Sequence, residues 1–89
     1  MLEPAHSLIE FLGGPREVAG LLGRHISRIY RWTYPEERGG TGGLIPSKEQ
    51  VKLLAVSEEH ALGLEPGDFF TSARLRTLLD EAKKLEAAE

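Results

Sequence analysis

The stretch that decides the fold is PREVAGLLGRHISRIYRWTYPEERGGTGGLIP, residues 15–46. Within it, Ala19, Gly23, Ile29 and Trp32 follow one another at intervals of four, six and three residues. These intervals suit two short helices joined by a tight turn, with a small residue where the helices approach and a glycine in the turn. The stretch therefore predicts a helix-turn-helix.

The two helices of this motif have recognisable ends. The first begins at Pro15, whose missing N–H costs no hydrogen bond at the first helical position, and Gly23 ends it. The second is expected from near His25 to about Trp32. Its surface keeps polar and basic side chains, namely Arg24, Ser27, Arg28, Tyr30 and Arg31. Arginine offers paired donors that match guanine edges or phosphates, so this surface suits DNA, although a solvated basic face is the simpler alternative.

A glycine-rich loop follows Pro35, which cannot continue the helix. Residues 36–45 hold four glycines around Thr41, with Arg38 beside them. The backbone N–H groups of such a flexible strip could approach a phosphate closely, and a plain linker is an equally good interpretation. A nucleotide-binding P-loop is not expected, because G-x-x-x-x-G-K-[ST] does not occur.

Helices are also expected before and after the motif. The first runs over residues 4–12 and ends at two glycines. Another opens at Ser47, with Gln50 as the second member of a capping box, and runs to near Ala61 before Gly63 ends it. Its inward residues are predicted to be Val51, Leu54, Ala55 and Leu62, and its first turns carry Lys48 and Lys52 on one face.

The C-terminal part divides into a short helical turn and a long helix. Residues 64–70 are expected to place Phe69 or Phe70 in the core, and the final helix runs from Ser72 to about Ala88. It carries an apolar stripe of Leu75, Leu78, Leu79, Ala82 and Leu85. The stripe either docks on its own domain or meets a second chain, and we favour the second chain. The chain is therefore divided into a DNA-binding domain, residues 1–70, and a dimerisation or partner-binding helix, residues 71–89.

Composition limits the function classes. The chain has 89 residues, no cysteine and a net charge of −3, yet residues 15–52 hold seven basic side chains against four acidic ones. No apolar run approaches the ~20 residues that cross a bilayer, and no secretory signal is visible, so we expect a cytoplasmic protein. The three histidines lie far apart in sequence and no catalytic triad can be drawn, so neither an enzyme nor a metal or cofactor site is expected.

The motif and the loop together resemble a known family. The string Tyr30-Arg31-Trp32, then Pro35, then residues 38–46 and Lys48 is similar to small prophage-derived regulators of the Cro-like and phage-repressor helix-turn-helix class. The resemblance covers about residues 5–70. It implies an all-α bundle of about five helices, with the third helix in the major groove of operator or promoter DNA. It also implies a homodimer in the bacterial cytoplasm, associated with the nucleoid.

These observations predict a sequence-specific regulator that binds double-stranded DNA. The base-reading residues are expected to be Ser27, Arg28, Tyr30 and Arg31. The backbone contacts are expected from Arg24, His25, Arg38, Thr41 and Lys48. The alternative is an antitoxin or adaptor that binds a partner protein through the acidic C-terminal helix.

Overall fold

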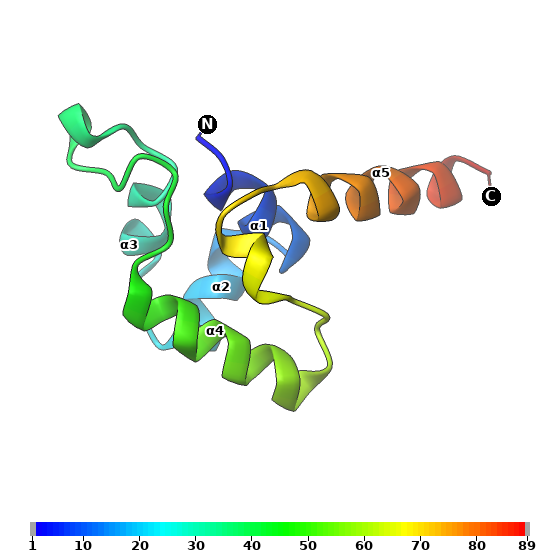
Figure 1. Ribbon diagram of the computed structural model, residues 1–89, viewed down its shortest axis with the longest axis horizontal. Helices are drawn as coiled ribbons and strands as arrows, with labels where there is room; N and C mark the ends of the chain where they lie inside the picture. The colour runs from blue at the N-terminus through cyan, green and yellow to red at the C-terminus, as the bar shows by residue number, and fades with distance from the viewer. Residues whose placement is uncertain (1, 89) are drawn as a thin grey trace.

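The computed structural model describes residues 2–88, and helices are the only regular secondary structure in this part of the chain (Figure 1). The α-helices are α1 (Ala5–Phe11), α2 (Pro15–Leu22), α3 (Ile26–Arg31), α4 (Ser47–His60) and α5 (Ala73–Ala88), with 3-10 turns η1 (Glu36–Arg38) and η2 (Pro66–Phe69). The predicted all-α bundle of about five helices is confirmed.

One core joins all five α-helices. The fully buried side chains include Leu8, Leu22, Ile29, Trp32, Leu53, Phe69 and Leu75. Trp32 is the largest of them and follows directly after α3. Burial of such side chains, at roughly 1.5–3 kcal/mol each, is what holds these short helices together, because helices of six to eight residues are not stable alone.

The turn between α2 and α3 depends on Gly23 and His25. Gly23 has φ 65°, a left-handed conformation that favours glycine, and it ends α2. His25 lies at the N-cap of α3, where serine is common. Its Nδ1 accepts a hydrogen bond from the Ser27 backbone N–H at 3.2 Å and lies 2.8 Å from the Ser27 hydroxyl. His25 and Ser27 together therefore fix the first residue of α3.

The glycine-rich loop is folded against the end of α3, so neither sequence interpretation of it was right. The Arg31 carbonyl accepts the Thr41 N–H at 3.0 Å, and the Tyr34 carbonyl accepts the Gly42 N–H at 2.9 Å. The Thr41 hydroxyl also lies within hydrogen-bond distance of the Trp32 carbonyl, at 3.2 Å. The Thr41 and Gly42 N–H groups are therefore used at carbonyls at and just after the end of α3, and they are not available to cradle a phosphate.

Gly40 shows how closely the loop fits. A Cβ atom at this position would clash with the Tyr34 carbonyl oxygen and lie only 2.6 Å from the Arg31 carbonyl oxygen. The Gly40 N–H meanwhile donates to the Pro35 carbonyl at 3.1 Å. Only glycine allows the backbone to approach this closely, so the loop is a packed cap and not a linker.

The predicted inward face of α4 was wrong for Val51 and Ala55. Leu53 and Ser57 are buried, whereas Val51 is 71% exposed and Ala55 is also exposed. Leu54, also predicted to face inward, is only partly buried. The buried residues recur every four positions because α4 packs against α2 along that line.

The predicted ends of α4 were also partly wrong. The Gln50 amide donates to the Ile45 carbonyl at 2.9 Å, so the capping box with Ser47 does not form. Ala61 adopts φ 53° and ends α4 two residues before Gly63. Leu62, predicted to face inward from α4, lies beyond its end and is partly buried.

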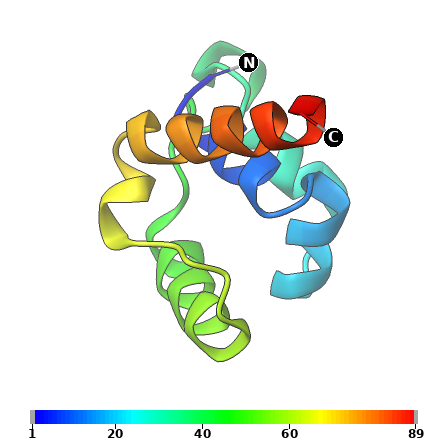
Figure 2. The same cartoon turned by 90° about the vertical axis from the view of Figure 1, so that its right-hand side faces the viewer.

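The final helix α5 has two unequal parts. Leu75 is fully buried against the common core, and Glu10 of α1 forms ion pairs at 3.5 Å with both Arg76 and Lys83. Beyond this contact α5 extends out of the body on the side away from α3 (Figures 1 and 2). Leu85, on this outer part, is 71% exposed. The start of α5 therefore belongs to the core, and residue 70 is not a boundary in the packing.

Candidate nucleic-acid interface

A basic groove runs between α3, the glycine-rich loop and the start of α4. It has a volume of about 480 Å³, and its lining includes Arg24, Arg28, Arg31, Thr41, Lys48 and Glu49. Five of the nine residues predicted to contact DNA thus meet around one hollow. They come from two helices, a turn and a loop, so only the folded chain brings them together.

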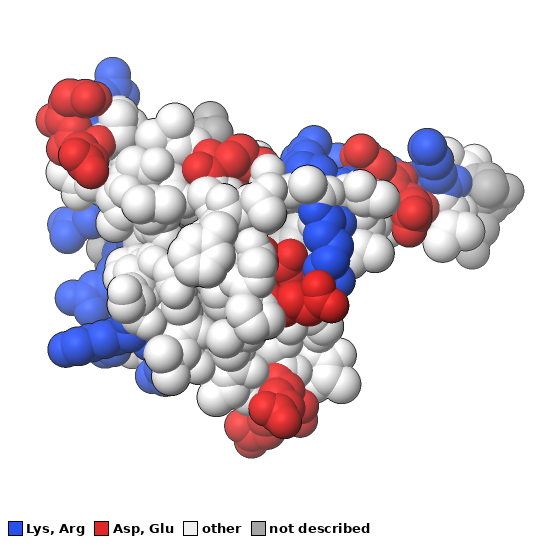
Figure 3. All heavy atoms as spheres, in the orientation of Figure 1, with Lys and Arg blue, Asp and Glu red and all other residues white. Residues whose placement is uncertain are grey.

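The two arginines of α3 line this groove, and their charges are not balanced by an ion pair within the described residues. Arg28 and Arg31 are one turn apart, both are exposed, and neither forms an ion pair with another residue of the described range 2–88. Figure 3 shows Lys and Arg side chains gathered over α3 and the start of α4, with Asp and Glu at the far end of α4. The positive charge is therefore local, although the whole chain is acidic.

Arg24 is held in place by Glu49, which was not among the site residues predicted from the sequence. The Glu49 Oε1 atom lies 3.1 Å from Arg24 Nη2 and 3.3 Å from Arg24 Nε. Glu49 is 5% exposed and lies in the first turn of α4, where the helix dipole favours a carboxylate. Arg24 is 38% exposed at its side chain, so it still faces the groove with part of its charge balanced.

The sequence does hold a signal for Glu49. A glutamate three residues after the N-cap normally accepts the N-cap backbone N–H, but Pro46 at this N-cap has none. The carboxylate is then left for another donor, which Arg24 supplies. Its second oxygen, Oε2, is buried without a hydrogen-bond partner in the described residues.

The two lysines of α4 have different roles. Lys48 is exposed and lines the groove beside the arginines. Lys52 instead donates from Nζ to the Leu22 carbonyl at 2.6 Å, where it satisfies the C-terminal end of α2. Lys52, which is one turn after Lys48 and was not among the residues predicted to contact DNA, therefore has a structural role.

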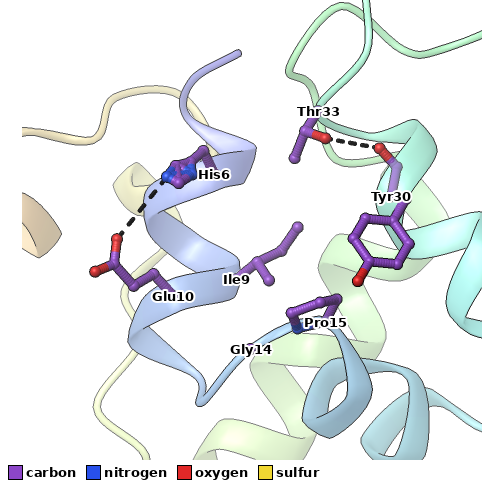
Figure 4. A pocket seen from close by; sticks show the side chains of 7 residues that line it. All are labelled: His6, Ile9, Glu10, Gly14, Pro15, Tyr30 and Thr33. Atoms are coloured by element: carbon purple, nitrogen blue, oxygen red, sulfur yellow. Dashed lines mark hydrogen bonds and ion pairs between the residues drawn. The ribbon is translucent and has the colours of Figure 1, made fainter. Parts of the chain in front are cut away.

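The remaining predicted residues lie outside the groove. His25 and Ser27 are bonded to each other at the start of α3, and Ser27 is still exposed there. Arg38 is exposed on η1 beside Glu36 and Glu37, which weaken its local positive field. Tyr30 lines a different hollow, between α1 and α3 (Figure 4). The arginines and Tyr30 thus lie along different edges of α3.

Comparison of the chain with protein-family models, with curated proteins and with solved structures found no match. Within residues 2–88, every helix is too short or too polar to cross a membrane.

Proposed function

We propose that this protein is a transcriptional regulator that binds double-stranded DNA sequence-specifically, with α3 in the major groove. The observation that carries the proposal is the basic groove, where Arg28 and Arg31 project from one helix and Lys48 from the start of the next. A major groove about 12 Å wide accepts an α-helix, and arginine is the side chain that most often reads guanine there.

The roles of the basic residues differ in this proposal. Arg28 and Arg31 are free of ion pairs within the described residues and stand on α3, so they read bases. Arg24 and Lys48 stand at the rim on other elements and hold phosphates on either side. Ser27 is exposed at the start of α3, outside the groove, and is the third base-reading residue of this proposal.

The folded loop supports this use of α3. A recognition helix of six residues needs rigid support, and the loop supplies it through the Thr41 and Gly42 N–H groups, which donate to the Arg31 and Tyr34 carbonyls. Trp32, at the C-terminal end of α3, is 1% exposed and packs in the core, so it anchors that end of the helix. A helix held at both ends loses little backbone entropy when its side chains bind DNA.

The proposal is tested by selecting bound duplexes from a random DNA pool and measuring affinity by fluorescence anisotropy. Arg28→Ala or Arg31→Ala should weaken binding to the selected duplex by about 1–3 kcal/mol and relax one position of the site. Arg16→Ala is the matched control, since Arg16 is exposed on α2 and does not line the groove. Equal losses on selected and scrambled duplexes would refute base reading.

We further propose that the outer part of α5 pairs with a second copy. Leu85 is 71% exposed on a helix that extends beyond the core, and two linked DNA-binding units bind more tightly than one. Leu85→Ser should shift the sedimentation of the chain toward monomer. A truncation after Phe70 is unsuitable, because it also removes the core residue Leu75. A wild-type monomer at all concentrations would instead favour a different protein partner for α5.

A further inference from the structure

The apolar stripe of α5 is covered at one end and bare at the other. Leu75 is fully buried, Leu78 packs partly against the core, and Leu85 is 71% exposed. At about 100° per residue, these three side chains lie within about 80° of one another, so they belong to one face of the helix. Residues 80–87, in the outer part of α5, are all exposed. The face that holds α5 on its own core therefore continues past that core without cover.

A second copy of the same segment is the cover that the composition of α5 supports. A helix end of so few residues is not stable in water alone, so it needs a packed face. Residues 80–87 carry three acidic side chains and two basic ones, a net charge of −1, so two copies of this segment repel each other only weakly. In a two-fold pair each stripe covers the other, and no second kind of surface is required.

The antiparallel arrangement of two α5 helices fits this chain, and the parallel one does not. The core lies on the striped side of α5 at the level of Leu75. Two parallel helices with facing stripes would therefore force the two cores into the same space. In an antiparallel pair each helix covers residues 80–88 of the other, a length of about 13 Å, and each core lies beyond the end of the other helix. The two bodies then lie at opposite ends of the pair.

The basic groove lies at the other end of the molecule from the outer part of α5. Figure 1 shows α3 and the start of α4 toward one end of the longest axis, which spans 41 Å, and α5 leaving the body at the other end. The Lys and Arg side chains over α3 face away from α5 (Figure 3). The two-fold axis of an antiparallel pair reverses this direction, so the two grooves of a pair face away from each other.

We infer that two chains joined through α5 bridge two separate segments of double-stranded DNA, one in each basic groove. This inference rests on the proposed function for the DNA and on the proposed pairing of α5 for the link. Neighbouring half-sites on one duplex, about 34 Å apart, require two recognition helices on the same side of a dimer. The grooves of this pair lie on opposite sides. The tighter binding of linked units is therefore gained only when the two sites lie on separate duplexes or on distant parts of one DNA.

A capture assay with the full-length chain tests the bridge. One duplex with the selected sequence is fixed to streptavidin beads through biotin, and a fluorescent copy of it is free in solution. At concentrations where sedimentation shows that the chain is paired, the wild-type chain should carry the fluorescent duplex onto the beads at least about tenfold above the level without protein. The signal should disappear when the biotinylated duplex is replaced by a scrambled one.

Two variants on the outer part of α5 make the test specific. Leu85→Ser should lower the capture at least about fivefold, because both copies lose buried apolar area. It should keep the affinity for a single duplex, measured by anisotropy, within about twofold, since Leu85 does not line the groove. Ala87→Ser is the matched control, because Ala87 is exposed about 160° around the helix from Leu85 and should keep the capture.

The outcomes separate the bridge from the proposed function. Failure to select any duplex would refute DNA recognition and the bridge together. A paired chain that binds the selected duplex but never captures the second copy would overturn the bridge alone. A selected site made of two inverted copies one helical turn apart would also overturn it, because that site needs both grooves on one side. A chain that stays monomeric at every concentration would overturn the link through α5.

Discussion

Replacing Gly40 with alanine should destabilise the protein far more than a change at an exposed loop position suggests. The added Cβ would clash with the Tyr34 carbonyl oxygen and lie 2.6 Å from the Arg31 carbonyl oxygen, and both are backbone atoms. The loop must therefore move away from α3. Three backbone hydrogen bonds depend on its position, from Gly40, Thr41 and Gly42, at 3.1, 3.0 and 2.9 Å.

At about 1 kcal/mol for each bond, the free energy of unfolding should fall by roughly 3 kcal/mol. For a domain of this size the midpoint of thermal unfolding should drop by roughly 12–24 °C. Urea denaturation followed by circular dichroism measures the change. Gly20→Ala is the matched control, since it lies inside α2 with nothing near its Cβ and should stabilise by roughly 0.5–1 kcal/mol.

A Gly40→Ala variant within about 0.5 kcal/mol of the wild type would show that the loop is not packed against α3. The loop would then be the flexible linker that its glycine content suggests. In that case α3 would lack its support, and the rigid presentation of Arg31 to DNA would lose its physical basis.

Three further substitutions test other parts of the structure. In urea denaturation, Leu53→Ala should lower the free energy of unfolding by about 2–5 kcal/mol and Val51→Ser by less than about 0.5 kcal/mol, because only Leu53 is buried. The reverse order would support the inward face of α4 that was predicted from the sequence. Asp68→Asn should lower the free energy of unfolding by about 1–3 kcal/mol, because the buried Asp68 carboxylate accepts hydrogen bonds from both Nε and Nη2 of the partly exposed Arg74. An unchanged free energy of unfolding would show that this pair does not stabilise the contact between η2 and α5. Glu49→Gln should leave the Arg24 charge unpaired and free to contact one further phosphate. The slope of log binding constant against log salt concentration should then steepen by up to about 0.9. An unchanged slope would show that Arg24 does not reach the DNA.

Local signals were enough to predict the helices around the motif. Pro15 and Gly23 delimit α2, and the bounds of α3 follow from the turn before it and Pro35 after it. Proline and glycine act through the backbone of their own position, so their effect can be inferred without knowing the fold. The grouping of Arg28, Arg31 and Lys48 around one groove also follows once these helices are placed.

Contacts between distant residues could not be predicted in this way. Glu49 meets Arg24 across 25 residues, and Lys52 reaches Leu22 across 30. The loop's hydrogen bonds join residues 40–42 to residues 31–35, and no repeating pattern in the sequence predicts them. The same holds for Tyr30, which belongs to α3 by sequence but borders α1 in space. Each depends on how two elements pack, which a single stretch of sequence does not specify.

The most direct test of DNA recognition by α3 is an NMR map of the ¹⁵N-labelled chain bound to a selected duplex. The largest shifts are expected at the side chains and amides of α3, at Thr41 and at the start of α4 around Lys48. The outer part of α5 should be unaffected by the DNA itself. Shifts confined to α1 and α5, with α3 unchanged, would contradict the assignment of the basic groove as the DNA-binding surface.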